Sequence, residues 1–89
     1  MKRVHLIISG SVHGVFFRDF VRNTAEELDL TGFVKNLTDS VEVIAEGSET
    51  NLLELIRLCK IGSSTSRVSN VSVKWTDYNN EFDSFSTNY

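Results

Sequence analysis

Residues 4–28, VHLIISGSVHGVFFRDFVRNTAEEL, pass from the apolar period of a strand to that of a helix. Large or β-branched side chains first alternate at Val4, Leu6 and Ile8, and this period of two predicts a strand. After a loop with two glycines, a stripe recurs at helical spacing and comprises Phe17, Phe20, Val21, Thr24, Ala25 and Leu28. This stripe predicts an amphipathic helix that ends near Asp29.

The same two periods recur along the rest of the chain. The elements predicted there are strands over 31–37 and 41–46 joined by a tight turn, a helix over 49–60 with Ser48 as its N-cap, and a strand over 71–76. The order is β-α-β-β-α-β, and each helix has one apolar stripe to bury. We therefore expect an α+β fold of the ferredoxin-like split β-α-β kind, with two helices on one face of a four-stranded antiparallel sheet. Phe82, Phe85 and Tyr89 are expected to hold a short final segment, which leaves room for a fifth edge strand.

Length and composition limit the class of protein. The chain has 89 residues, which predicts a single domain over residues 1–89, and its net charge of −3 argues against a nucleic-acid partner. No apolar run approaches the roughly 18 residues of a membrane span, and the basic start lacks the cleavage pattern of a signal peptide. We therefore expect a cytoplasmic protein without a membrane partner.

Most of the remaining conspicuous side chains have structural explanations. Cys59 is the only cysteine, which excludes an internal disulfide, and it is expected to be a buried hydrophobe on its helix. His5 and His13 have no acidic or thiol partner at ligand spacing, so no metal site is predicted. Trp75 and the phenylalanines are expected in the core. Glu42 and Glu46 alternate with apolar neighbours and are expected on a solvated face.

The loop from Gly10 to Arg18 is the richest candidate for chemistry. It enters a helix, and the N-terminus of a helix offers free N–H groups and about half a positive charge. Arg18 stands in the first turn, and Gly10 and Gly14 would let the backbone approach a ligand closely. These features predict an anion site, although a plain strand–helix loop with a solvated arginine has the same pattern.

Three stretches resemble the acylphosphatase family. Residues 10–18, GSVHGVFFR, resemble its signature G-x-V-Q-G-V-x-F-R. Residues 25–36, AEELDLTGFVKN, resemble the continuation A-x-x-L-G-L-x-G-W-V-x-N, and residues 41–47, VEVIAEG, match V-E-x-x-x-E-G. The likeness spans almost the whole chain, and the family fold is the split β-α-β arrangement.

The resemblance implies hydrolysis of acyl phosphates, the mixed anhydrides of a carboxylic acid and phosphate. It implies that backbone N–H groups hold the phosphate in the loop of His13, Gly14, Val15, Phe16 and Phe17. It also implies that Arg18 binds the phosphoryl group and that Asn36 orients the attacking water. No metal or organic cofactor is implied, inorganic phosphate would be product or inhibitor, and a monomer is expected.

Two alternatives stand beside this interpretation. The first is a non-catalytic module of the same fold that binds a phosphoryl or carbamoyl phosphate group. The second is an RNA or protein-interaction domain, which the missing basic face and stacking aromatics disfavour.

The sequence departs from the family pattern in several places. His13 stands where glutamine is usual and introduces a titratable group beside the loop. Asp29 replaces a glycine after the first helix, which predicts a small stability cost if the backbone there is left-handed. The turn before Val41 is one residue short and lacks its usual glycine, so it tightens close to Asn36. Phe33 replaces tryptophan, and Gly62-Ser63-Ser64 replaces G-P-P.

Overall fold

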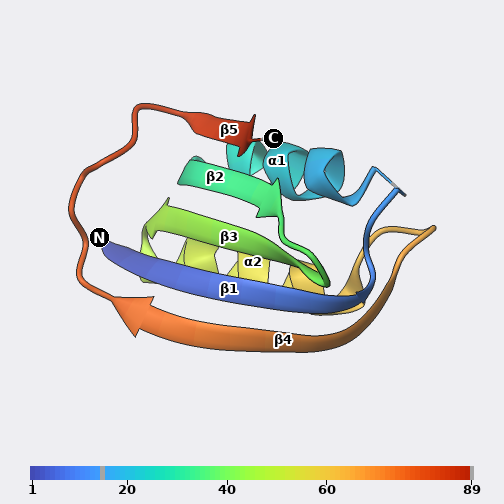
Figure 1. Cartoon of the computed structure of the whole chain (residues 1–89). Coiled ribbons are helices and arrows are strands. Elements are labelled where there is room, and N and C mark those ends of the chain that lie inside the picture. Colours follow the sequence, from blue (N-terminus) through green and yellow to red (C-terminus); the bar gives the residue numbers. More distant parts are fainter. Residues whose placement is uncertain (15, 89) are drawn as a thin grey trace.

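The structure is a computed structural model that describes residues 1–14 and 16–88. Its elements are β1 (Lys2–Ser11), α1 (Phe17–Glu27), β2 (Thr31–Asn36), β3 (Ser40–Gly47), α2 (Glu49–Ile61), β4 (Arg67–Thr76) and β5 (Phe85–Asn88) (Figure 1). The predicted order of elements is confirmed, and a short strand follows it. The largest difference in bounds is at β4, which begins at Arg67 rather than near Val71.

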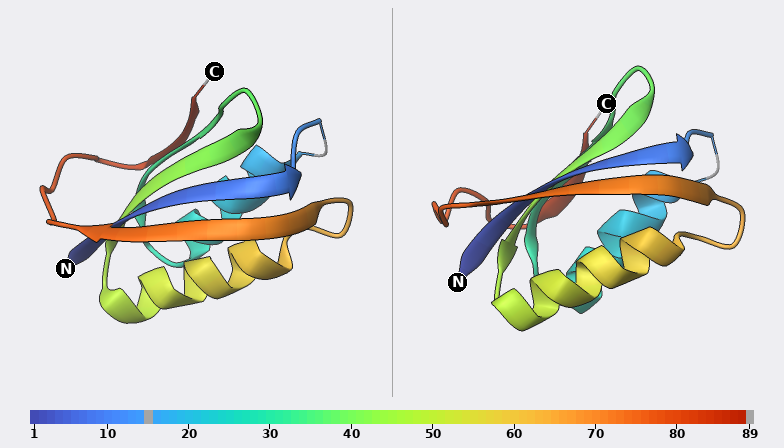
Figure 2. Two further views of the ribbon diagram at one scale, coloured as in Figure 1. Left: turned by 60° about the horizontal axis from the view of Figure 1, so that its bottom comes forward. Right: turned by 90° about the horizontal axis from the view of Figure 1, so that it is seen from below.

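All five strands form one sheet in the order β4-β1-β3-β2-β5. Neighbouring strands among the first four pair antiparallel, whereas β5 lies parallel to β2 at the edge. Both helices cover the same face of this sheet, and the other face is left open (Figure 2). The predicted four-stranded arrangement with a fifth edge strand is therefore confirmed. Tyr89, expected to help hold the final segment, lies outside the described residues.

The core lies between the sheet and the helices. Alternate residues of the central strands and one stripe of each helix meet there, namely Val4, Leu6, Ile8, Val34, Val41, Val43, Ala45, Phe17, Val21, Ala25, Leu52, Leu55 and Cys59. The predicted burial of Cys59 is confirmed, and burial raises the pKa of its thiol to about 12.

The two helices begin and end differently. Ser48 is the N-cap of α2, as predicted, and its Oγ accepts the N–H of Asn51 at 3.2 Å. The amide Nδ2 of Asn51 donates to the carbonyl oxygen of Leu28 at 2.9 Å, which joins α2 to the end of α1. Asp29 has a φ of 55°, so the left-handed residue after α1 is an aspartate where glycine would be relaxed.

The expectation that Trp75 and the phenylalanines lie in the core was wrong for four of them. Phe33 and Phe82 contact each other outside the core. Trp75 is 41% exposed because β4 is an edge strand, and only its first half, through Val68 and Val71, packs against the core. Phe16 is 83% exposed because the chain turns outward just before α1. Phe17, its neighbour in sequence, is buried.

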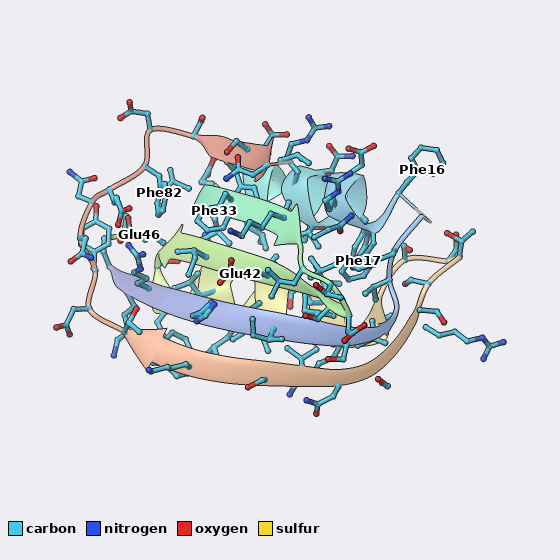
Figure 3. All side chains as sticks on the ribbon, viewed as in Figure 1. Phe16, Phe17, Phe33, Glu42, Glu46 and Phe82 are labelled. Atoms are coloured by element: carbon cyan, nitrogen blue, oxygen red, sulfur yellow. The ribbon has the colours of Figure 1, made fainter. Side chains whose placement is uncertain are left out.

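The expectation that Glu46 lies on a solvated face was also wrong, since its side chain is only 1% exposed. Its carboxylate accepts the N–H groups of Asn79 at 2.8 Å and Glu81 at 3.0 Å, and Nη1 of Arg3 donates to it at 3.4 Å. The segment between β4 and β5 crosses the open face of the sheet at Glu46 and covers this side chain (Figure 3). In the same segment the ring of Phe82 contacts the ring of Phe33. Burial by itself raises the pKa of Glu46. The two backbone N–H groups and Arg3 together lower it by more than burial raises it, so the pKa lies below the ordinary value.

Glu42 is partly exposed, and it too is partnered. Its Oε2 lies 2.8 Å from Nε2 of His5, and its Oε1 lies 3.6 Å from Nζ of Lys35. The open face therefore contains ion pairs along β1, β2 and β3 rather than isolated charges.

Candidate active site

The loop between β1 and α1 is held at its two ends by buried side chains. Val12 and Phe17 are both buried, whereas His13, Gly14 and Phe16 between them are exposed. Gly14 has a φ of 70°, a conformation that favours glycine. Figure 3 shows that Phe17 points into the molecule and Phe16 points away from it. Val15, a predicted phosphate contact, lies outside the described residues.

The first turn of α1 has no capping side chain. Phe16 occupies the N-cap position with a φ of 57°, and its side chain makes no cap hydrogen bond. N–H groups in the first turn of a helix have no partner within the helix, and the helix dipole adds positive potential there. An anion can therefore satisfy these groups, as it does at many helix N-termini.

Arg18 reaches from this turn to the last strand of the sheet. Its Nη1 donates to the carbonyl oxygen of Asn88 at 3.0 Å. Asn88 in β5 lies opposite Lys35 in β2, and Asn36 is the next residue along that strand. The guanidinium of Arg18 is therefore anchored one register position from Asn36, the exposed last residue of β2.

His13 connects the same loop to the other side of this strand end. Its Nε2 lies 2.7 Å from the carbonyl oxygen of Ser40, which also accepts the N–H of Leu37 at 2.8 Å. A carbonyl oxygen only accepts, so Nε2 of His13 holds a proton. The short turn after Asn36 is thereby tied to the loop before α1.

A hollow of about 190 Å³ lies beside Arg18 and is lined by Phe16, Arg18, Asp19 and Thr87. Its lining includes an exposed aromatic residue, an arginine and an aspartate. The Oγ1 of Thr87 is buried and has no hydrogen-bond partner among the described residues.

Gly10 does not belong to this site, contrary to expectation. It lies within β1, beside an irregularity in the pairing with β4, and its φ is 127°. A Cβ at Gly10 would collide with the backbone carbonyl oxygen of Arg67. Glycine is required there by close packing of two strands and not by approach to a ligand.

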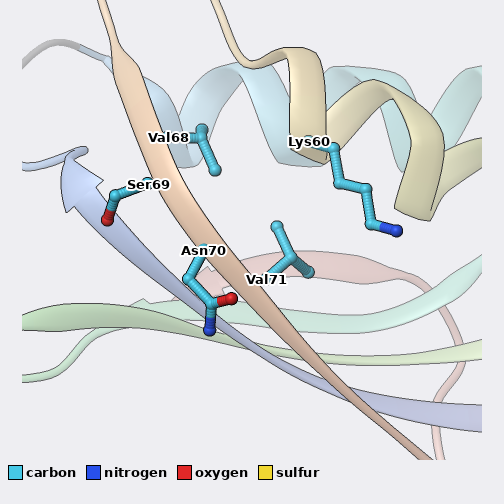
Figure 4. A pocket seen from close by; sticks show the side chains of 5 residues that line it. All are labelled: Lys60, Val68, Ser69, Asn70 and Val71. Carbon is cyan, nitrogen blue, oxygen red and sulfur yellow. The ribbon is translucent and has the colours of Figure 1, made fainter.

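Two larger hollows lie elsewhere and contain none of the predicted site residues. One, of about 300 Å³, lies between α2 and β4 and is lined by Lys60, Val68, Ser69, Asn70 and Val71 (Figure 4). The other, of about 420 Å³, lies on the open face beside Arg3, His5 and Lys74. The size of a hollow therefore does not identify the site. The smaller hollow is the candidate because Phe16 and Arg18, both predicted site residues, line it at the uncapped start of α1.

The structure adds two observations on metals and membranes. In residues 1–14 and 16–88, no three side chains of His, Cys, Asp or Glu are grouped as ligands for a metal ion. Neither helix of that part of the chain has the length and apolarity needed to cross a bilayer.

Sequence reasoning missed the contribution of β5. The carbonyl oxygen of Asn88 accepts from Arg18, and Thr87 lines the hollow beside it. Neither residue is of a type that marks a functional site in a sequence. The available signal was the spacing of two between Phe85 and Thr87, and so short a pattern does not distinguish a strand from a loop.

Comparison with known proteins identifies the family of this chain. The acylphosphatase family model matches residues 4–87. An acylphosphatase from Pelotomaculum thermopropionicum is 43% identical over 93% of this chain and 91% of its own length, and one from Caldanaerobacter subterraneus is 45% identical over 94% of both. The crystal structure of acylphosphatase from Bacillus subtilis superposes with a TM-score of 0.96, at 37% identity and complete coverage of both chains. The chain therefore belongs to the acylphosphatase family.

Proposed function

We propose that this acylphosphatase uses Arg18 to bind the phosphoryl group of its substrate and Asn36 to orient the attacking water. As a member of the family, it is an enzyme that hydrolyses acyl phosphates to a carboxylate and inorganic phosphate. The observation that supports these two roles is the anchoring of Arg18, from an uncapped helix start, beside the strand end that holds Asn36.

The proposed phosphate site combines three sources of positive potential. The guanidinium of Arg18 presents a planar set of donors at fixed charge, which suits two phosphate oxygens at once. In this proposal the backbone N–H groups of the loop from His13 to Phe17 also bind the phosphate, and the dipole of α1, whose first turn has no capping side chain, adds positive potential. These groups would stabilise charge on the equatorial oxygens as the phosphoryl group is transferred.

Asn36 has the chemistry to hold a water but not to deprotonate it. Its amide both donates and accepts, and it is no base near neutral pH. In the proposed step the water oxygen bonds to phosphorus while the bond from phosphorus to the carboxyl oxygen breaks. The water proton passes to a phosphate oxygen of the substrate, and the carboxylate leaves with the bonding pair. A carboxylate is a good leaving group, so no general acid is required.

The domain organisation, the oligomeric state and the cellular compartment are proposed from the sequence and its chemistry. We expect residues 1–89 to act as one domain, since a single core contains side chains from both helices and the sheet. We also expect the protein to act as a monomer. The lone, buried Cys59 fits the reducing cytoplasm. The net charge of −3 fits a small-molecule substrate rather than nucleic acid.

The test is hydrolysis of benzoyl phosphate, followed by its ultraviolet absorbance in buffer with a chelator. Arg18→Ala and Asn36→Ala are each expected to lower kcat by about 100-fold or more, the usual effect of removing a group that acts on the transition state. Arg57→Ala and Asn23→Ala are the matched controls, because both residues are exposed on helices and lie outside the site. Circular dichroism checks that each variant is folded.

The outcomes separate the hypotheses. Loss of activity in both site variants with retention in both controls supports the assigned roles. Wild-type activity in folded Arg18→Ala contradicts them. Phosphate binding by wild type without any turnover would favour the non-catalytic binding module.

A further inference from the structure

We propose that the side chain of Phe16 contacts the acyl group of the substrate and gives this enzyme a preference for apolar, uncharged acyl phosphates, aromatic ones above all. The inference rests on the proposed function, since it places the phosphoryl group at Arg18. It adds a role for the exposed side chain of Phe16, a residue that the proposed phosphate site uses only through its backbone N–H.

The exposure of Phe16 requires an explanation. Its side chain is 83% exposed, so it contributes almost nothing to the hydrophobic stabilisation of the fold. Its φ of 57° is also unfavourable for a bulky residue, and an asparagine or glycine would adopt this conformation with less strain. The backbone at the start of α1 thus holds an aromatic ring in solvent at the edge of the phosphate loop (Figure 3).

The surroundings of Phe16 match the two ends of an acyl phosphate. The hollow beside it is lined by Phe16 and Arg18 together, so an apolar ring and a guanidinium border the same space. An acyl phosphate joins a dianionic phosphoryl group to an acyl group through one bridging oxygen. With the phosphoryl group on Arg18, the acyl group lies within reach of the ring and replaces water on its face.

Asp19 narrows the class of substrate. Its carboxylate lines the same hollow and is about half exposed, with Nη2 of Arg22 at 3.6 Å. An acyl group with a second negative charge would meet this carboxylate and be disfavoured. An uncharged apolar acyl group meets no such penalty and gains the contact with Phe16.

The experiment compares kcat/KM for benzoyl phosphate with kcat/KM for acetyl phosphate, in wild type and variants. Phe16→Gly removes the ring and suits the backbone conformation, whereas Phe16→Tyr keeps the ring. Trp75→Ala is the matched control, because Trp75 is a half-exposed aromatic on β4, the edge of the sheet opposite β5. The ratio of the two constants does not depend on the folded fraction of a variant, since both are measured on one preparation.

Phe16→Gly is expected to lower the ratio of benzoyl to acetyl about 3- to 10-fold, the effect of losing one aromatic contact. Phe16→Tyr and Trp75→Ala are expected to leave this ratio at the wild-type value. An unchanged ratio in Phe16→Gly, or an equal fall in Trp75→Ala, would overturn the inference. Wild type that hydrolyses neither compound would instead overturn the proposed function, and the inference with it.

Discussion

Nε2 of His13 donates a hydrogen bond of 2.7 Å to the carbonyl oxygen of Ser40, twenty-seven residues further along the chain. The same oxygen accepts the N–H of Leu37, the residue that follows Asn36. One carbonyl therefore joins the proposed phosphate loop to the turn that ends the strand of Asn36. This contact is made by the histidine that replaces the usual glutamine of the family signature.

The bond from His13 predicts a graded response to substitution. His13→Ala leaves the Ser40 carbonyl without this donor and is expected to lower kcat/KM for benzoyl phosphate about 3- to 10-fold. His13→Gln supplies an amide donor of similar reach and is expected to lose less. Steady-state kinetics on both variants check this, and equal losses would show that the hydrogen bond does not position the loop.

Asp29 predicts a stabilising substitution. Its φ of 55° favours glycine, so Asp29→Gly is expected to raise the free energy of unfolding by about 0.5–1 kcal/mol. Glu26→Gly, in the last turn of α1, is the matched control, and it is expected to lower that free energy by about 0.5 kcal/mol. Urea denaturation measures both, and destabilisation by both glycines would contradict the backbone argument.

Glu46 predicts a dependence of stability on pH. Its carboxylate is ionised in the folded state and accepts from Asn79, Glu81 and Arg3, so Glu46→Gln is expected to cost about 1–3 kcal/mol at about pH 7. The folded pKa lies below the ordinary value of 4.5, so the stabilisation is complete above that value. It is lost as the pH falls through the folded pKa.

The difference in unfolding free energy between wild type and Glu46→Gln should therefore be constant near neutrality and shrink below about pH 4.5. Urea titrations at several pH values test this. Glu27→Gln, at an exposed position on α1, is the control and is expected to stay within about 0.5 kcal/mol of wild type. A difference that is independent of pH would rule out the ionised carboxylate as its source.

Cys59 predicts a thiol that is inert in the folded protein. Burial raises its pKa to about 12, and the thiolate is the reactive form. Ellman's reagent at about pH 8 is expected to leave the native protein unmodified and to label one thiol per chain in concentrated urea. Rapid labelling of the native protein would mean that α2 opens readily from the sheet.

The order of elements and the residues of the signature could be predicted from the sequence alone. Helical and strand periods are local, so the stripe from Phe17 to Leu28 predicts its own helix with no knowledge of its partners. The cap at Ser48 and the left-handed residue at Asp29 are likewise local, since each depends on the backbone of a few neighbouring residues.

The assembly of the site was decided by the tertiary structure. Arg18 and Asn88 lie seventy residues apart in the chain and meet because β5 adds to the sheet beside β2. The burial of Glu46 and the exposure of Trp75 also depended on where the segment after β4 crosses the sheet and which strand is at its edge. The residue types and local conformations were determined by the sequence by itself, because short-range sterics and periodicity govern them. The neighbours of each side chain were decided only by long-range packing, because no local pattern encodes which strands pair.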